Sequence, residues 1–255
     1  QLGLDSIMLV NLSLKLEEML EAHGLDTPEM RERVADLSLL QALHVSDLRN
    51  GLAVVQAPDA ALVDIPRLLD GAAADVRRSE QSEMLADAAL PLPELAIEAA
   101  SGGSVLVTGA TGFLGAFITR SLIELTDAHI VALVRCDGAA HGVERIRRAL
   151  LETDMAPQAV AAALADRLSV VPGDVSQDRL GLAEPDWAEL TRCVGAIYHC
   201  AAEVDYVKSY GLLRGANVVG TREVIRLASE RRRKALHHIS TTFVHGWAAK
   251  PVIYE

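Results

Sequence analysis

The stretch Val105-Leu-Val-Thr-Gly-Ala-Thr-Gly-Phe-Leu-Gly115 decides the fold of this chain. A short apolar, β-branched run leads into three glycines, and apolar residues at helical spacing follow. This pattern predicts a strand, a tight turn and a helix, which together place a dinucleotide pyrophosphate at a helix N-terminus. The alternative is an ordinary glycine-rich turn. The residues expected to hold the nucleotide here are Gly109, Thr111, Gly112, Phe113, Leu114 and Gly115.

The net charge lies entirely in the first part of the chain. Residues 1–100 carry 7 Lys or Arg and 18 Asp or Glu, whereas residues 101–255 carry 17 of each. This imbalance favours two units of different character. The acidic first unit disfavours nucleic acid and anionic membranes as partners, and it suits docking onto basic patches of partner enzymes.

The cysteines and the apolar runs indicate the cellular compartment and bear on whether the chain spans a membrane. Cys136, Cys193 and Cys200 have neither metal-ligand spacing nor a disulfide framework, which favours a reducing, cytoplasmic compartment and no metal site. No apolar run approaches the roughly 18 residues that span a bilayer, and no signal peptide is visible. Because Gln1 stands inside a motif, we expect the chain to be a piece of a longer protein.

From residue 104 onward, strand and helix patterns alternate. Continuously apolar strands in such an alternation predict an α/β fold with a doubly wound, Rossmann-type parallel sheet covered on both faces. The strands are expected at 104–108, 129–134, 168–172, 195–199 and 235–240. The helices are expected at 113–126, 141–153, 157–166, 186–193 and 213–232, and the run Arg231–Lys234 is expected to be a solvated helix end.

The residues before 104 have a different organisation. Apolar residues at helical spacing predict a helix over 6–22, within a small all-α region that covers residues 1–55. Residues 56–103 are rich in proline and alanine and end in Ser101-Gly-Gly103, which predicts a linker with a short helix near 65–78. The nucleotide-binding part is expected to cover residues 104–255.

The residue after the second strand indicates which dinucleotide binds. In dinucleotide folds, a residue about 20 positions past the glycines meets the adenosine ribose. An acidic residue there would repel a 2′-phosphate, but this chain has Arg135, whose guanidinium presents a fork of donors to phosphate oxygens. The sequence therefore favours NADPH, and Arg145 in the next helix is placed to reach the same phosphate. The alternative is a surface arginine at a strand end.

Two further strand ends carry candidate cofactor residues. The third strand is followed by Gly173-Asp174-Val175, where the Asp174 carboxylate is placed to bond the adenine amino group. The fourth strand runs into His199-Cys-Ala201-Ala202, where small side chains leave room for the cofactor backbone. Plain turn chemistry is the alternative for both segments.

These motifs together resemble the extended short-chain dehydrogenase/reductase superfamily. Within it, Leu133-Val-Arg135 and the segment 201–207 are similar to the terminal thioester reductase domains of nonribosomal peptide and polyketide synthases, which carboxylic acid reductases share. The motifs that carry the resemblance are Thr108–Gly115, Gly173–Val175, His199–Ala202, Asn217-Val-Val-Gly-Thr221 and Ile239-Ser-Thr-Thr-Phe-Val-His-Gly246.

The start of the chain resembles an acyl or peptidyl carrier protein. Leu2-Gly-Leu-Asp-Ser6-Ile is similar to the motif in which a phosphopantetheinyl transferase attaches 4′-phosphopantetheine to serine. Ser6 would begin an apolar helix, where an attached phosphodiester meets the positive helix end. The alternative is a simple helix cap. Carrier domains have a helix before this serine, so we expect only part of the domain here.

The resemblance implies reductive release of an acyl or peptidyl thioester that upstream synthase modules deliver on the arm at Ser6. Hydride from NADPH would give an aldehyde, and a second hydride an alcohol. By similarity to the superfamily's catalytic Ser/Thr, Thr241 would donate a hydrogen bond to the oxygen that gains charge, with Thr242 as the fallback.

The superfamily's catalytic Tyr-x-x-x-Lys pair is absent from these residues. Tyr198 is followed at that spacing by Ala202, and Tyr210 by Arg214. In the family the pair falls after the Ser/Thr strand, so we expect the chain to stop short of it and to turn over little. The alternative is a parent protein that has lost the pair.

Three other functions remain open from sequence alone. A sugar-nucleotide epimerase or dehydratase of the same superfamily would share the glycines and the strand-end threonine, but it would need neither Arg135 nor a carrier serine. A non-redox domain of the same shape could release the chain by cyclisation. A carrier-plus-scaffold protein with a vestigial nucleotide site would not be an enzyme at all.

Overall fold

The computed structural model describes residues 6–22, 27, 28, 31, 35, 78–205 and 208–241. The chain forms two compact units. One unit comprises Gln1–Pro91 with Val204–Arg214, and the other comprises Leu92–Glu203 with Gly215–Glu255. The second unit contains the whole sheet and is called the sheet unit below.

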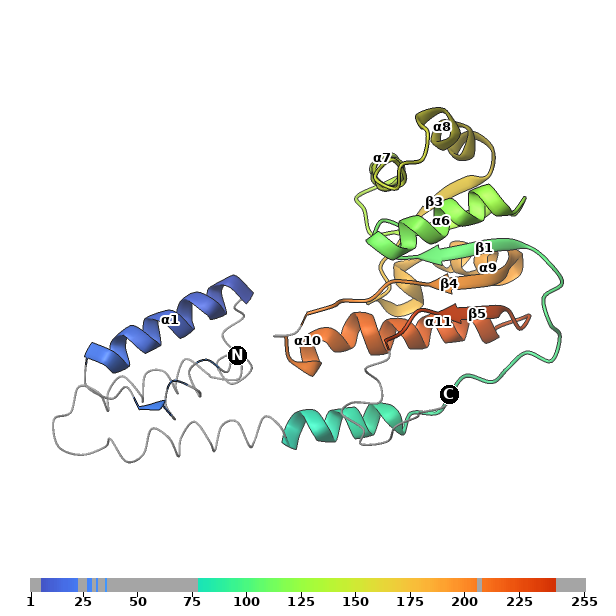
Figure 1. Ribbon diagram of the computed structural model, residues 1–255. Coiled ribbons are helices and arrows are strands. Elements are labelled where there is room, and N and C mark those ends of the chain that lie inside the picture. The colour runs from blue at the N-terminus through green and yellow to red at the C-terminus, as the bar shows by residue number, and fades with distance from the viewer. Residues whose placement is uncertain are drawn as a thin grey trace, which may run out of the picture. The chain divides into compact units, whose positions relative to one another are not determined.

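The sheet unit is built on five parallel strands. They are β1 (Ser104–Thr108), β2 (Ile130–Val134), β3 (Leu168–Pro172), β4 (Val194–His199) and β5 (Ala235–His238), and all but β2 are labelled in Figure 1. The strand order is β3-β2-β1-β4-β5, so the chain leaves β1 in one direction and later returns to its other side at β4. This confirms the predicted Rossmann-type fold, in which ligands bind at the carboxyl ends of strands near such a switch.

Helices cover both faces of the sheet. Because neighbouring side chains of a strand point to opposite faces, Val105 and Val107 pack with one set of helices and Leu106 with the other. The first face carries α6 (Phe113–Leu125), α7 (Ala139–Leu151) and α8 (Pro157–Asp166). The second carries α9 (Glu184–Cys193) and α11 (Gly220–Ser229). Two short helical turns complete the unit, η1 (Asp178–Gly181) and η2 (Gly215–Val219).

The last predicted helix is shifted by three residues toward the N-terminus at both ends, and the last strand is shorter than expected. Helical structure predicted over 213–232 begins at α10 (Tyr210–Arg214), continues through η2 and ends with α11 at Ser229, and β5 ends at His238 instead of residue 240. Helix α7 runs over 139–151 where 141–153 was expected. The strands at 104–108 and 168–172 and the helix at 157–166 are confirmed at both ends.

A buried lysine explains why α11 ends early. Lys234 is only 5% exposed, and its ammonium donates hydrogen bonds to the carbonyls of Glu230 at 2.8 Å and Arg232 at 2.9 Å. These bonds fold the chain around the C-terminus of α11, where a cation is favourable. Burial lowers the pKa of Lys234 to about 8. The prediction that this run is wholly solvated is therefore wrong for Lys234.

The described residues of the first unit are mostly helical. Helix α1 runs from Ser6 to Ala22, as predicted. Residues 78–88 are helical, and α10 also belongs to this unit. The helix predicted near 65–78 lies outside the described residues apart from Arg78.

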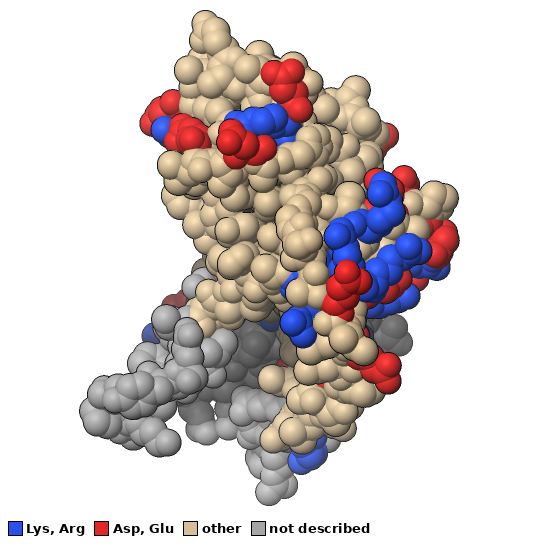
Figure 2. All heavy atoms as spheres, turned by 90° about the vertical axis from the view of Figure 1, so that its right-hand side faces the viewer, with Lys and Arg blue, Asp and Glu red and all other residues tan. Residues whose placement is uncertain are grey.

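Charges on the sheet unit are mixed. Figure 2 shows Lys and Arg side chains close to Asp and Glu side chains on one face. Exposed ion pairs such as Arg192–Glu189 and Arg147–Glu144 also bring opposite charges together. This agrees with the zero net charge of residues 101–255. Among the described helices, none is long and apolar enough to cross a membrane.

Candidate nucleotide site

The turn after β1 accepts only glycine at two positions. Gly109 has a φ of +71°, and a Cβ there would lie 2.6 Å from the backbone nitrogen of Ala201. A Cβ on Gly115 would overlap the carbonyl oxygen of Gly109. The missing side chains let β1, α6 and the segment after β4 approach one another at the carboxyl edge of the sheet.

The N-terminus of α6 faces this turn with its own backbone donors. The N-cap is Gly112, whose N–H donates to the Gly109 carbonyl at 2.9 Å, and no side chain caps the helix. The first N–H groups of a helix have no acceptor within it and favour an anion. Phe113 and Leu114, at the start of α6, have side chains 85% and 46% exposed. The turn and the helix start form a cradle that fits a pyrophosphate.

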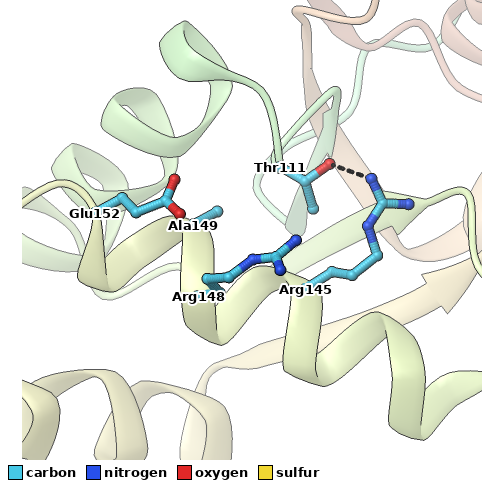
Figure 3. A pocket seen from close by; sticks show the side chains of 5 residues that line it. All are labelled: Thr111, Arg145, Arg148, Ala149 and Glu152. Atoms are coloured by element: carbon cyan, nitrogen blue, oxygen red, sulfur yellow. Dashed lines mark hydrogen bonds between the residues drawn. The ribbon is translucent and has the colours of Figure 1, made fainter.

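A cationic pocket lies beside the turn, between the glycine loop and α7. Figure 3 shows Arg145 and Arg148 extending from α7 toward the space beside Thr111, with Glu152 one turn further along. The Arg145 guanidinium lies 3.5 Å from the Thr111 hydroxyl, to which it donates. Two guanidinium groups at one end of the cradle fit a phosphate ester.

Of the two arginines predicted to bind the 2′-phosphate, only Arg145 has a side chain that lines the pocket. Arg145 lines the pocket, and its guanidinium also donates to the carbonyl of Arg135. The side chain of Arg135 is exposed and is not among those that line the pocket. Arg148 was missed by the sequence analysis. Its spacing of three residues from Arg145, which puts both on one helix face, was the available signal.

Asp174 lies where predicted, after β3. One of its carboxylate oxygens accepts hydrogen bonds from the backbone N–H of Ser176 at 2.9 Å and from its hydroxyl at 2.7 Å. The backbone N–H of Asp174 donates to the carbonyl of fully buried Leu180 at 2.7 Å. The neighbouring Val175 packs closely against α11, where a Cβ on Gly220 would lie 2.7 Å from the Val175 carbonyl oxygen.

The segment after β4 lies against the glycine turn. The N–H of Ala201 donates to the Thr108 hydroxyl at 3.3 Å, and Ala202 is exposed. His199, at the end of β4, is 1% exposed, and its ring contacts the hydroxyls of Thr108 at 2.7 Å and Thr221 at 3.1 Å. Burial, with a smaller effect from the nearby His238, lowers the pKa of His199 to about 4. The ring is therefore neutral at pH 7.

The remaining predicted site residues lie elsewhere. Thr241 is exposed and follows the end of β5 by three residues, and Thr242 lies outside the described residues. Ser6 is the first residue of α1, in the other unit. The structure therefore gathers Gly109, Thr111, Gly115, Arg145 and Ala201 around one turn.

The fold and the glycine turn agree with the comparison with protein families. Residues 107–255 match the NAD-binding family described as "Male sterility protein". The chain belongs to this family. The match begins inside β1 and takes in the glycine turn, the arginine pocket and the segment after β4.

Relatives of this NAD-binding domain occur in large synthases. The chain is 44% identical over 140 residues to a component of the linear gramicidin synthase of Brevibacillus parabrevis, covering 55% of this chain and 3% of that protein. It is 33% identical over 228 residues to the isonitrile lipopeptide synthase of Mycobacterium tuberculosis, covering 85% of this chain and 9% of that protein. The chain thus spans less than a tenth of either relative.

A solved structure supports the same assignment. The terminal R domain of the myxalamid PKS-NRPS biosynthetic pathway aligns with a TM-score of 0.59 and 42% identity, over 64% of this chain and 42% of that one. Together with the synthase relatives, this structure confirms the prediction for this chain: it belongs with the terminal reductase domains, which are part of the extended short-chain dehydrogenase/reductase superfamily.

The described residues of this NAD-binding domain fit a nicotinamide dinucleotide. A side chain at Gly109 or Gly115 would overlap neighbouring backbone, so only glycine lets the turn pack this closely beside the start of α6. The uncapped start of α6 suits the pyrophosphate, and the pocket with Arg145 suits a further phosphate at one side. Such a cofactor supplies a hydride to a bound carbonyl carbon.

Proposed function

We propose that this chain is part of a multidomain synthase in which the sheet unit, with NADPH, releases a carrier-bound acyl or peptidyl thioester as an aldehyde. A second reduction of the same carbon would give an alcohol. The observation that carries the proposal is the two-arginine pocket beside the glycine turn, in a chain of this reductase family.

The pocket is the reason for choosing NADPH over NADH. Arg145 and Arg148 present two cations beside Thr111, and the 2′-phosphate is the group by which NADPH differs from NADH. Arg135 directly follows β2, and its backbone carbonyl accepts a hydrogen bond from Arg145. We propose that its exposed side chain reaches the same phosphate from outside the pocket. Hydrogen bonds between charged partners are the stronger ones in proteins.

The substrate would arrive on a prosthetic arm. Ser6 at the start of α1 is the proposed attachment point for 4′-phosphopantetheine, added by a phosphopantetheinyl transferase. Upstream synthase modules would load the acyl or peptidyl group onto the arm. The tether would keep the local concentration of this thioester near the sheet unit high. The alignment over 85% of the chain with a lipopeptide synthase supports a carrier region before the reductase. Cytoplasmic placement fits the three free cysteines.

The residues of the chain would bind and polarise the thioester. The Thr241 hydroxyl would donate a hydrogen bond to the carbonyl oxygen while negative charge develops there. Loss of the C–S bond would then leave an aldehyde and return the carrier thiol with a proton. The 255 residues hold no tyrosine four positions before a lysine, so we propose that they bind cofactor better than they turn over.

The test is aldehyde formation by a protein that carries this chain with its natural flanking sequence. A transferase and an acyl-CoA load Ser6, mass spectrometry detects the added acyl arm, and an aldehyde trap follows NADPH addition. We expect Thr241→Val to slow aldehyde formation about 100-fold, as for the loss of one oxyanion donor, with NADPH affinity unchanged and Thr241→Ser close to wild type.

Two results would contradict the proposal. One is a loaded wild-type protein that consumes NADPH without releasing an aldehyde or an alcohol. The other is a Ser6→Ala variant that still acquires the acyl arm, while Ser13→Ala serves as a matched control on the same helix and should load normally.

A further inference from the structure

A buried chain of hydrogen bonds runs behind the segment after β4. It links the backbone of Ala201 through Thr108, His199 and Thr221 to the carbonyl of Asn217. Thr108 and His199 are 0% and 1% exposed. The proposed function uses none of these side chains, although Ala201 lies against the glycine turn.

The donor and acceptor of each hydrogen bond in this series follow from the Thr221 hydroxyl. The single hydroxyl proton of Thr221 is donated to the carbonyl of Asn217 at 2.8 Å. Thr221 can therefore only accept from His199, so Nε2 of the ring carries the proton. In a neutral ring Nδ1 is then an acceptor, and Thr108 donates to it at 2.7 Å.

The opposite tautomer would satisfy fewer groups. With the proton on Nδ1, Thr108 would receive two hydrogen bonds, from His199 and Ala201. Thr221 would have to turn its proton to Nε2 and leave the carbonyl of Asn217. Because buried polar groups are costly when unpaired, the Nε2–H tautomer is the one that this geometry holds.

The far end of the same segment is held by the side chain of Asn217 in η2. The amide oxygen of Asn217 accepts from the N–H of Glu203 at 2.8 Å, and its amide nitrogen donates to the Glu203 carbonyl at 2.8 Å. The backbone between Ala201 and Glu203 is thus fixed at both ends by buried or half-buried groups.

We propose that Thr108 and His199, with the ring proton on Nε2, are positioning residues that hold the Ala201 backbone against the glycine turn for the nicotinamide half of the cofactor. The inference rests on the proposed function, because it concerns the same cofactor. The adenosine half would lie toward Arg145 and Asp174, whose hydrogen bonds are separate from this series.

Two probes separate the halves of the site. NADPH spans both, whereas adenosine 2′,5′-bisphosphate carries only the adenine and the 2′-phosphate. In titrations of the full chain, we expect Thr108→Val to weaken NADPH binding about tenfold, the effect of losing about one hydrogen bond, and to leave the bisphosphate affinity at the wild-type value. The control Thr191→Val removes an equally buried hydroxyl, which donates to the Ala188 carbonyl within α9, and should change neither affinity.

Variants of the histidine test the same point without touching the turn. The amide of His199→Asn can replace Nδ1 and keep Thr108 in place, so NADPH affinity should stay near wild type. The longer His199→Gln puts its amide near the Nε2 position and should weaken NADPH binding as Thr108→Val does. Long-range nitrogen–proton NMR should show the His199 proton on Nε2.

Each other outcome overturns a defined part of the account. Wild-type NADPH affinity in Thr108→Val and His199→Gln, or a proton on Nδ1, contradicts the inference and leaves the proposed function standing. Equal loss of both probes also contradicts it, because that is the effect of general destabilisation. Failure of the wild-type chain to bind either probe contradicts the proposed function together with the inference.

Discussion

At the scale of single residues, the charge of His199 links stability to pH. The ring contacts Thr108 and Thr221 and stacks on His238 of β5, with ring centroids 5.2 Å apart. The folded chain therefore resists protonation of His199 until a pH of about 4, whereas an unfolded chain takes up the proton near 6.5.

The sign of the effect follows from proton uptake. Between pH 6.5 and 4 the unfolded state binds the proton that the folded state refuses, so the free energy of unfolding falls as the pH falls. We expect His199 to account for a loss of about 3 kcal/mol over this window. Urea denaturation at pH 7, 5.5 and 4 measures it. His199→Asn should lose less stability than wild type, and identical pH slopes for the two proteins would contradict the prediction.

Some residues of the site follow from sequence and others do not. The glycines and Arg145 could be predicted because a turn of positive φ and a phosphate partner demand particular residue types. Arg148 could have been found from its three-residue spacing to Arg145, which puts both on one helix face. The pairing of His199 with Thr221 could not, because it depends on how two distant segments meet in space. Strand-end position also predicted Arg135 for the same phosphate, and its exposed side chain does not line the pocket.

At the scale of elements, residues 78–88 and α10 are joined by a buried carboxylate. The Asp87 side chain is 6% exposed and accepts two hydrogen bonds from Arg214, each 2.6 Å long, and one from the Tyr210 hydroxyl at 2.7 Å. Burial and the bond to Asp87 raise the pKa of Tyr210 to about 12. Glu80 accepts from the backbone N–H of Tyr210 at 3.0 Å. These bonds fasten α10 to the helix that precedes Pro91.

Removing this carboxylate should loosen both helices. We expect Asp87→Ala to lower the free energy of opening at residues 210–214 by about 2 kcal/mol, because Arg214 and Tyr210 lose a charged partner. Hydrogen exchange at the backbone amides measures the change. The control Asp127→Ala removes a fully exposed carboxylate 4.0 Å from Arg167 and should have little effect. Unchanged exchange at α10 in Asp87→Ala would show that the contact contributes nothing.

The elements were largely predictable up to the last helix. Apolar, β-branched runs predicted β1 and β3 at both ends, since buried parallel strands need nothing else to mark them. The run Arg231–Lys234 has the composition of a polar helix end, and nothing in it shows that Lys234 is drawn inward by the carbonyls of Glu230 and Arg232. These local contacts hold the chain in a turn directly after α11, which ends at Ser229.

At the scale of the whole molecule, charge and structure divide the chain in a similar place. The acidic residues 1–100 contain α1 and the helical residues 78–88, and the near-neutral remainder contains the sheet. The predicted division into carrier region (1–55), linker (56–103) and reductase (104–255) remains a prediction. The bridge between Ala99 and Arg233 shows that backbone before residue 104 already takes part in the sheet unit.

The central claim, a pyridine dinucleotide with a 2′-phosphate at the turn after β1, is tested most directly by fluorescence titration of the 255-residue chain with NADPH and NADH. We expect NADPH to bind at least about tenfold more tightly. Arg145→Ala should abolish most of that preference, because one charged hydrogen-bond partner of a phosphate contributes about 1.5–3 kcal/mol. Arg147→Ala, on the same helix but paired with Glu144, should keep it. Equal affinities for the two nucleotides, or no binding of either, would contradict the account.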